Sequence, residues 1–302
     1  MEISAQMVKE LRERTGAGFM DCKAALAEAG GDFEQAQVIL RKRGVALAEK
    51  KAARAANDGI IASHLGPDGR LGVLVEVNCE TDFVAKNPEF RALAAEIAKL
   101  VAEHAPTKLR AEDQPKGGPA LSDLKLSGKG TVGETLKEAV AKFGENMAVR
   151  RFERIEAPQS GTLGCYIHAG GKIGVMVALR GPDGGAEGLR RLARDLAMHV
   201  CAANPSYVAP ADVPAAVIER EREIARDQMA SSGKPPAVID KIIDGKLKKF
   251  YGEVCLVEQP FVRDEGKTVG ALLTESAQQL GGSVQVERFV RYQLGGEGEK
   301  DS

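Results

Sequence analysis

The sequence contains an internal duplication, and this feature constrains the fold more than any other. Similar blocks occur twice in the same order, at offsets of 99 to 137 residues. The matching blocks are residues 71–75 (LGVLV) with 173–177 (IGVMV), 91–98 (RALAAEIA) with 190–197 (RRLARDLA), 131–133 (TVG) with 268–270 (TVG), and 149–154 (VRRFER) with 286–291 (VERFVR). A repeated block indicates a repeated structural unit, so we expect two related units in one chain.

Each copy has the pattern strand, turn, strand, long helix, connection, helix and strand. The two apolar runs of each copy are separated by turn residues, GPDG at 66–69 in copy one and Gly170 with Gly171 in copy two. Antiparallel sheets with helices on one face satisfy this pattern. We therefore predict an α+β fold with core subdomains at residues 57–157 and 158–294.

The helix starts of copy one carry specific signals. Asn87 and Pro88 provide an N-cap and a first-turn proline for the long helix. Thr131 and Glu134 have the spacing of a capping box at the start of the next helix.

Copy two carries an insertion between its helices. Its offset from copy one grows from 99 to 137 residues, which places 38 additional residues at about 210–252. The insertion predicts an antiparallel helical hairpin, with a polar break near residues 231–236 and an apolar stripe on its second helix. The stripe is Ile239, Ile243, Leu247 and Phe250. We expect the hairpin to project as an arm; the alternative is that it folds back on the core.

The first 56 residues form a separate helical pattern. Three short helices are expected, with a break at residues 15–18, a stop at Gly30 and Gly31, and Asp32 as the N-cap of the third. The alanine- and lysine-rich stretch 47–56 is either a linker or a helical connector. At the other end, residues 295–302 are a polar tail that we expect to be disordered.

Composition excludes several classes of protein. The net charge is −1 at pH 7, which argues against a nucleic-acid binder that relies on overall positive charge. Five scattered cysteines without a CxxC pair argue against a disulfide framework or a structural zinc site. No apolar run reaches the roughly 18–20 residues of a membrane helix, and the start of the sequence lacks an export signal. We expect a cytoplasmic protein that binds no membrane and no nucleic acid directly.

Motifs of enzyme chemistry are absent or incomplete. Residues 128–133 (GKGTVG) spell GxGxxG, but no strand pattern precedes them, so these glycines are expected to form turns. Gly266, Lys267 and Thr268 resemble the end of a P-loop whose first glycine position holds Phe261. No nucleophile–base pair is evident, so we expect no catalytic residues and no covalent chemistry.

The four histidines lack the spacing of metal ligands, so no metal site and no cofactor are expected. His104 and His199 lie near predicted helix C-termini, where a charged imidazolium would complement the helix dipole.

One loop distinguishes the two copies. The connection between the strand at 71–77 and the following helix is three residues longer in copy one than in copy two. It carries the carboxylate of Asp82 next to Phe83. Two interpretations are open: Phe83 packs under the helix while Asp82 serves as a cap, or the loop is functional.

Four segments resemble one known family. They are residues 11–23 (LRERTGAGFMDCK), 76–85 (EVNCETDFVA), 166–175 (YIHAGGKIGV) and 266–270 (GKTVG). In sequence and order they are similar to the motifs of bacterial elongation factor Ts, and the resemblance extends over about residues 1–294.

The resemblance implies a guanine-nucleotide exchange factor for elongation factor Tu in translation elongation. It implies that residues 1–56 resemble a ubiquitin-associated three-helix module that docks on the partner's GTPase domain. It also implies that the hairpin at 210–252, a coiled coil, is an arm for homodimerisation. Some members continue into a C-terminal helix, which we expect to be absent after Ser302. GDP, GTP and Mg²⁺ would be bound by the partner.

The resemblance also assigns residues. Thr81, Asp82, Phe83 and Val84 would dislocate Mg²⁺ from the partner, with Phe83 as a wedge and Asp82 supporting it. Arg12, Met20, Lys23 and His168 would contact the partner. Two alternatives remain at this point: an interaction or chaperone-like protein without exchange activity, and an enzyme that uses residues 128–133.

Overall fold

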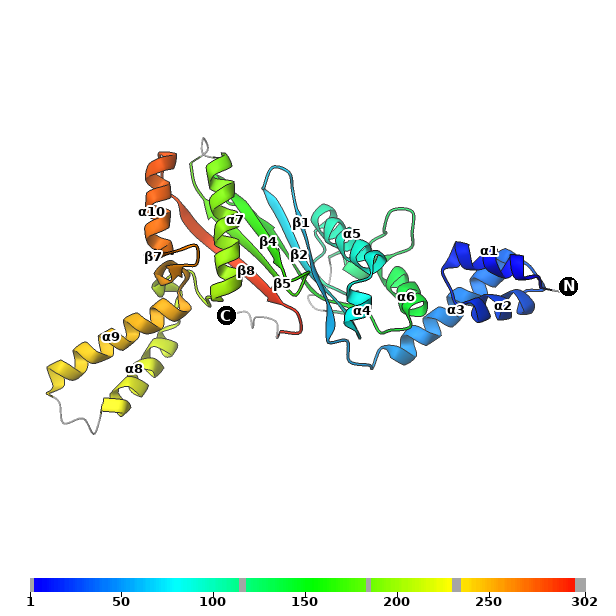
Figure 1. Cartoon of the computed structure of the whole chain (residues 1–302), viewed down its shortest axis with the longest axis horizontal. Coiled ribbons are helices and arrows are strands. Elements are labelled where there is room, and N and C mark those ends of the chain that lie inside the picture. Colours follow the sequence, from blue (N-terminus) through cyan, green and yellow to red (C-terminus); the bar gives the residue numbers. More distant parts are fainter. Residues whose placement is uncertain (1–2, 114–117, 183–185, 230–234, 297–302) are drawn as a thin grey trace.

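The structure is a computed structural model that describes residues 3–113, 118–182, 186–229 and 235–296. A helical unit lies at one end, two sheets lie in the middle, and a helical hairpin extends from the other end (Figure 1). Within these residues, no helix combines the length and the apolar character needed to cross a membrane.

Three helices form the N-terminal unit: α1 (Ala5–Thr15), α2 (Phe19–Glu28) and α3 (Phe33–Lys51). The side chain of Ser4 accepts a hydrogen bond from the backbone of Met7, and that of Asp32 accepts one from Gln35. These caps satisfy backbone donors that the helices leave open. Because α3 continues to Lys51, the alanine- and lysine-rich stretch begins as a helical connector. The small core of the unit consists of Val8, Leu11, Cys22, Ala25, Leu26 and Ala36.

Each copy of the duplication supplies one three-stranded antiparallel sheet, in the orders β1-β2-β3 and β4-β5-β8. The expected sequence of elements is present in both copies, and the capping box of Thr131 and Glu134 is formed. Copy one comprises β1 (Asp58–Leu65), β2 (Leu71–Cys79), α4 (Asp82–Ala85), α5 (Pro88–His104), the 3₁₀ turn η1 (Leu121–Asp123), α6 (Val132–Phe143) and β3 (Ala148–Glu156). Copy two comprises β4 (Gly161–His168), β5 (Ile173–Arg180), α7 (Ala186–Ala203), α10 (Val269–Leu280) and β8 (Gln285–Gln293).

The two sheets pack face to face, which the sequence analysis did not anticipate. Along β2, Val73 and Val75 face the helices, whereas Leu74 faces the second sheet. The layers are therefore helix, sheet, sheet, helix (Figure 1). The central layer consists of Ile61, Leu74, Ile155, Ala157, Leu163, Met176, Ala178, Val290 and Tyr292. An unbroken apolar run such as 71–75 is typical of a strand that is buried on both faces.

Close approach of the sheets depends on two equivalent glycines. A Cβ at Gly72 would lie 2.1 Å from Met176 Sδ, and one at Gly174 would lie 2.5 Å from Ile61 Cγ2. Neither position has room for a side chain.

The insertion in copy two forms the helices α8 (Ala215–Met229) and α9 (Pro236–Val254), which lie side by side and extend away from the sheets (Figure 1). Three residues of the predicted stripe, Ile239, Ile243 and Leu247, pack against α8, and the fourth contact is made by Tyr251 instead of Phe250. Steps of four residues keep one helix face, so the stripe ends at 251. Residues 231–234 of the predicted break lie outside the described residues, as do residues 297–302 of the polar tail.

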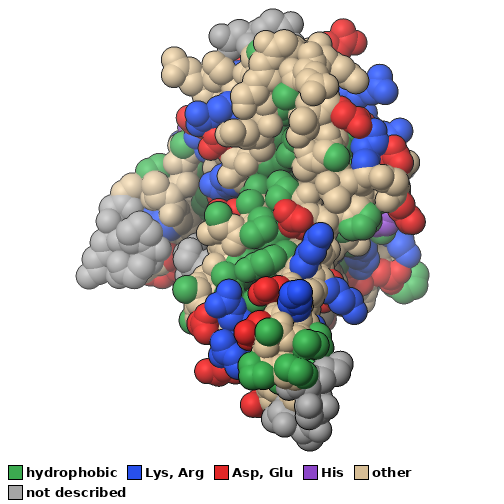
Figure 2. All heavy atoms as spheres, turned by 90° about the vertical axis from the view of Figure 1, so that its left-hand side faces the viewer, with side chains coloured by type: hydrophobic (Ala, Val, Ile, Leu, Met, Phe, Trp, Pro, Cys, Tyr) green, Lys and Arg blue, Asp and Glu red, His purple; other side chains and the backbone are tan. Residues whose placement is uncertain are grey.

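The base of the hairpin joins it to copy two. Short elements close this region: η3 (Pro210–Asp212), η4 (Leu256–Glu258), β6 (Pro260–Phe261) and β7 (Asp264–Thr268). Backbone hydrogen bonds of 2.9 and 3.0 Å run from Leu256 to Tyr207 and from Val257 to Val208. Figure 2 views the molecule from this end and shows apolar side chains interspersed with charged ones.

Candidate functional site

The loop that distinguishes copy one presents Phe83 to solvent. Thr81 caps the single turn α4, and Val84 and Ala85 turn into the core beneath it. Phe83 points away and is 82% exposed, the highest exposure among the large apolar side chains that the structure describes. The interpretation in which Phe83 packs under the helix is therefore wrong, because Val84 and Ala85 take that place.

Asp82 does not cap α4; that role belongs to Thr81. One carboxylate oxygen of Asp82 lies 2.5 Å from Lys86 Nζ, one turn along the chain. The hydrogen bond to Asp82 raises the pKa of Lys86 above its ordinary value. Both side chains of this pair are exposed on the surface next to Phe83.

Glu145 holds the loop in place. Its carboxylate accepts hydrogen bonds from the backbone of Glu80 at 3.1 Å, from the backbone of Thr81 at 3.0 Å and from the hydroxyl of Thr81 at 2.6 Å. Hydrogen bonds to a carboxylate are among the strong ones in proteins. Sequence reasoning missed Glu145, because a glutamate after the Gly144 helix stop signals only a turn.

The same loop is tied to the connector that follows α3. The carboxylate of Glu80 accepts a hydrogen bond from the backbone of Asn146 at 2.6 Å and lies 3.6 Å from Arg54. The Asn146 amide donates in turn to the carbonyl of Arg54 at 2.7 Å, and Lys51 donates to Gly144. The N-terminal unit and the Phe83 loop thus share one turn as their support.

Cys79 lies under the loop and is not a nucleophile. Its thiol is buried and donates to the Thr81 carbonyl at 3.2 Å. Burial, assisted by the nearby carboxylate of Glu145, raises the pKa of Cys79 to about 12. The thiol therefore stays protonated, and nucleophilic chemistry requires the thiolate.

His168 ends β4 on the opposite copy and is exposed. Its Nδ1 lies 3.0 Å from the hydroxyl of Tyr166. The turn after it docks on copy one, since the backbone of Ile61 donates to the Gly171 carbonyl at 2.7 Å and Lys172 lies 2.5 Å from Asp58. Asp58 also pairs with Cys79 in the sheet register, so this turn sits at the end of the sheet that leads into the Phe83 loop.

The other predicted contact residues lie on the N-terminal unit. Arg12 is on α1, and Met20 and Lys23 are on α2; all three side chains are exposed, Met20 by 70%. Phe19 and Val38 are also exposed on this unit, and the sequence analysis did not select them. The sequence alone does not distinguish these exposed apolar residues from the core residues of the unit; the burial of each side chain in the folded unit does.

The two histidines near predicted helix ends lie away from the Phe83 loop. His199 is fully buried in α7, where its Nε2 lies 3.0 Å from Gln259 Oε1 and its Nδ1 accepts from the backbone of Val262 at 3.2 Å. Burial lowers the pKa of His199, so the expectation of an imidazolium on the helix dipole is wrong for it. His104 does end α5.

The glycine motifs serve turns, as expected. Gly128 has φ 68° in a tight turn, closed by hydrogen bonds from Lys129 to Leu126 and from Leu126 to Gly130. Lys267 pairs with Glu275 at 2.6 Å and with Asp264 at 3.4 Å. In the described ranges, no group of three or more His, Cys, Asp or Glu side chains could hold a metal ion.

Comparisons with known proteins agree with one another. A family model described as "Elongation factor TS" matches residues 80–296. A protein named elongation factor Ts from Symbiobacterium thermophilum is 46% identical over 297 residues, 97% of this chain and 92% of that protein. The one from Aquifex aeolicus is 45% identical over 98% of this chain and 99% of its own length. The one from Alkalilimnicola ehrlichii is 47% identical over 99% and 94%.

Proposed function

The chain belongs to the elongation factor Ts family of translation elongation factors, and from this premise we propose that it is a guanine-nucleotide exchange factor. It binds elongation factor Tu carrying GDP, disturbs the Mg²⁺ and phosphate site, and promotes GDP release so that GTP binds. The observation that carries the proposal is Phe83, an exposed aromatic side chain on a turn that Glu145 braces. Aromatic side chains at the centre of an interface supply much of its binding energy.

The mechanism is coupling between two binding equilibria. A factor that stabilises a partner conformation with a disrupted Mg²⁺ site weakens GDP, and GDP weakens the factor by the same coupling energy. Each tenfold gain in the rate of GDP release requires about 1.4 kcal/mol of that coupling. Phe83 acts as the wedge, Thr81 and Val84 fix its support, and Asp82 supplies a carboxylate at the rim.

Other surfaces of the chain complete the proposed contact. Arg12, Met20 and Lys23 bind the partner's GTPase domain from the N-terminal unit, and His168 meets the partner from copy two. The hairpin of α8 and α9 is an arm for homodimerisation, a role supported by Ile224 and Val238, which are exposed on it.

We further propose that the chain acts in the cytoplasm, performs no covalent chemistry and holds no cofactor of its own. The partner carries GDP, GTP and Mg²⁺. The domain limits 1–56, 57–157, 158–294 and 210–252 stay predictions from the sequence.

Release of fluorescent GDP from elongation factor Tu tests the function. We expect this chain at saturating concentration to accelerate release, and we expect chelation of Mg²⁺ by EDTA to shrink that advantage. Acceleration that is the same with and without EDTA would assign the action to the phosphates or the base instead of Mg²⁺. A chain that binds the partner but leaves release unchanged would be an interaction or chaperone-like protein.

A further inference from the structure

Arg91 joins the two copies at the place where both carry predicted contact residues. It lies in the first turn of α5, immediately after the Phe83 loop. Its Nε donates to the carbonyl of Ala85 at 3.2 Å, and its Nη2 donates to the carbonyl of Gly170. One guanidinium therefore holds the end of α4 on copy one and the turn after His168 on copy two.

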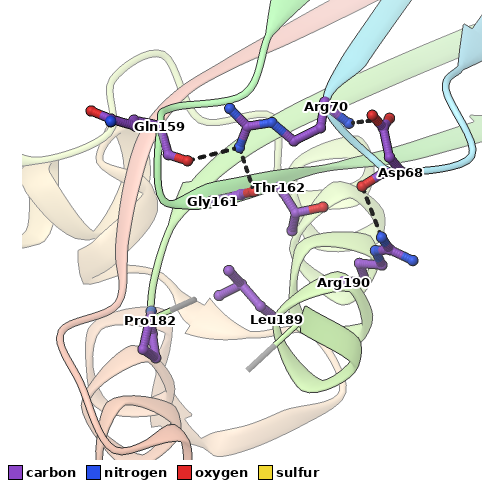
Figure 3. A pocket seen from close by; sticks show the side chains of 8 residues that line it. All are labelled: Asp68, Arg70, Gln159, Gly161, Thr162, Pro182, Leu189 and Arg190. Atoms are coloured by element: carbon purple, nitrogen blue, oxygen red, sulfur yellow. Dashed lines mark hydrogen bonds between the residues drawn. The ribbon is translucent and has the colours of Figure 1, made fainter. Parts of the chain in front are cut away.

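The duplication supplies a twin of this residue. Arg190 lies 99 residues later, at the matching position of α7, and its Nη2 donates to the Asp68 carbonyl at 2.8 Å. Figure 3 shows this side chain reaching the turn between β1 and β2. Both arginines thus reach a turn of the opposite copy. In the described part of the chain, only Arg91 also contacts a short helix that carries an exposed aromatic.

The turn held by Arg190 has a second side-chain support that makes more hydrogen bonds than the corresponding support of the Gly170 turn. Arg70 donates to the carbonyls of Gln159 at 3.2 Å and Gly161 at 3.0 Å (Figure 3), and also to that of Pro158 at 2.6 Å. Its counterpart at an offset of 102 is Lys172, a single ammonium that pairs with Asp58. The contact of Arg91 therefore contributes more to holding the Gly170 turn in place than the contact of Arg190 contributes to holding the turn at Asp68.

We propose that Arg91 is a positioning residue that fixes Phe83 and His168 relative to each other, so that both reach the partner as one rigid surface. The inference rests on the proposed exchange function. A helix of one turn such as α4 has no stability of its own, because nucleation is costly and its last carbonyls are open. Arg91 satisfies one of these carbonyls and anchors it to the opposite copy. A guanidinium suits this role, since it presents several donors in a fixed plane.

The test compares Arg91→Gln with Arg190→Gln in the full chain. Amide hydrogen exchange in the free protein is the first measurement. We expect Arg91→Gln to speed exchange within residues 82–87 by about tenfold, the effect of losing one charge-assisted hydrogen bond. Arg190→Gln should leave these amides unchanged. Thermal unfolding of both variants controls for a general loss of stability.

GDP release from elongation factor Tu at saturating factor is the second measurement. Saturation removes effects on affinity, so a lower rate reports the geometry of the bound factor. We expect Arg91→Gln to lower the rate by about three- to tenfold and Arg190→Gln by less than about twofold, in line with the loss of one hydrogen bond. Equal effects of the two variants in both measurements would overturn the proposal. If the wild-type chain itself does not accelerate release, the exchange function fails, while hydrogen exchange still decides the role of Arg91.

Discussion

The two copies of the duplication are held together by matching contacts. The backbone of Leu163 donates to Gly69 at 2.8 Å, and the backbone of Ile61 donates to Gly171 at 2.7 Å. The two donors are 102 residues apart in the sequence, and so are the two acceptors. The turn of each copy therefore docks on the first strand of the other.

The closing strands make matching contacts within each copy. Ala157 donates to Arg70 at 2.7 Å and Leu294 donates to Lys172 at 2.9 Å, with donors 137 residues apart. The bonds to Gly69 and Gly171, which do cross between the copies, are those of a two-fold interface, in which each partner offers the same patch. The core has this arrangement within a single chain.

The copies differ where the matching contacts end. Copy one has the longer loop with α4 and Phe83, whereas copy two has the hairpin of α8 and α9. Residues that the copies share are occupied by the interface between them and by their cores. Apart from His168, the features of the two copies that we expect to meet a partner are those that only one copy has, and substitutions can test this division.

The largest expected effect is that of Phe83→Ala. Truncating a central aromatic anchor costs about 2–4 kcal/mol, so GDP release at saturating factor should slow by at most roughly 30- to 1000-fold. Because Phe83 is exposed, the melting temperature should stay unchanged. If the defect is as large in EDTA as in Mg²⁺, the wedge does not act through Mg²⁺.

Leu65→Ala is the matched control. Leu65 is also apolar and partly exposed, but it pairs with Gly72 at the end of β1 opposite to Asp58 and the Phe83 loop. The Leu65→Ala variant should leave the rate of GDP release unchanged. A defect comparable to that of Phe83→Ala would refute the assignment of the site.

A smaller effect is expected for Glu145→Ala, which removes the brace and leaves Phe83 in place. Three donors of the loop lose their acceptor, at a cost of about 1–3 kcal/mol in unfolding free energy. GDP release should slow by about tenfold, because a looser loop presents Phe83 less often. Glu156→Ala, at an exposed pair with Arg154, should change neither quantity. A normal rate in a destabilised Glu145→Ala protein would show that the brace serves folding alone.

Residues differ in how far the sequence could predict them. Asn87 with Pro88 and Thr131 with Glu134 are local signals, so the helix starts follow from the sequence. Glu145 reaches Thr81 across 64 residues of chain, and no local pattern encodes that contact. Likewise the apolar run of β2 predicts burial on both faces, but it does not say that the second face meets another sheet. The exposure of Phe83 required knowing that Val84 and Ala85 fill the space beneath the helix.

Deleting residues 215–252 tests the feature specific to copy two. Ala225, Ile243 and Leu247 form a cluster of their own, separate from the core of copy two. With a short Gly/Ser linker, we expect a single cooperative unfolding transition and a melting temperature within a few degrees of the wild type. Self-association in ultracentrifugation should disappear. Loss of cooperative unfolding would place the hairpin in the core, and unchanged self-association would exclude it as the dimerisation arm.

The smallest effect concerns one position where the two cores differ in chemistry. His199 of α7 corresponds to Leu100 of α5, at the offset of 99 residues, and both side chains are buried. Burial lowers the pKa of His199, so the folded chain holds the ring neutral while the unfolded chain takes up a proton below about pH 6.5. The stabilisation is therefore complete above that pH and declines as the pH falls toward the folded value, by at most about 1.4 kcal/mol per pH unit.

The substitution His199→Leu places at this position the residue type that copy one has at Leu100. The variant should be less stable at pH 7.5, since Gln259 Oε1 and the backbone of Val262 lose their partner. Between pH 7.5 and 5.5, however, its unfolding free energy should fall less than that of the wild type, as measured by urea denaturation. The difference between the two proteins cancels the titration of all other groups. Parallel pH profiles would mean that His199 is protonated in the folded chain and that its hydrogen bonds rearrange to accept the charge.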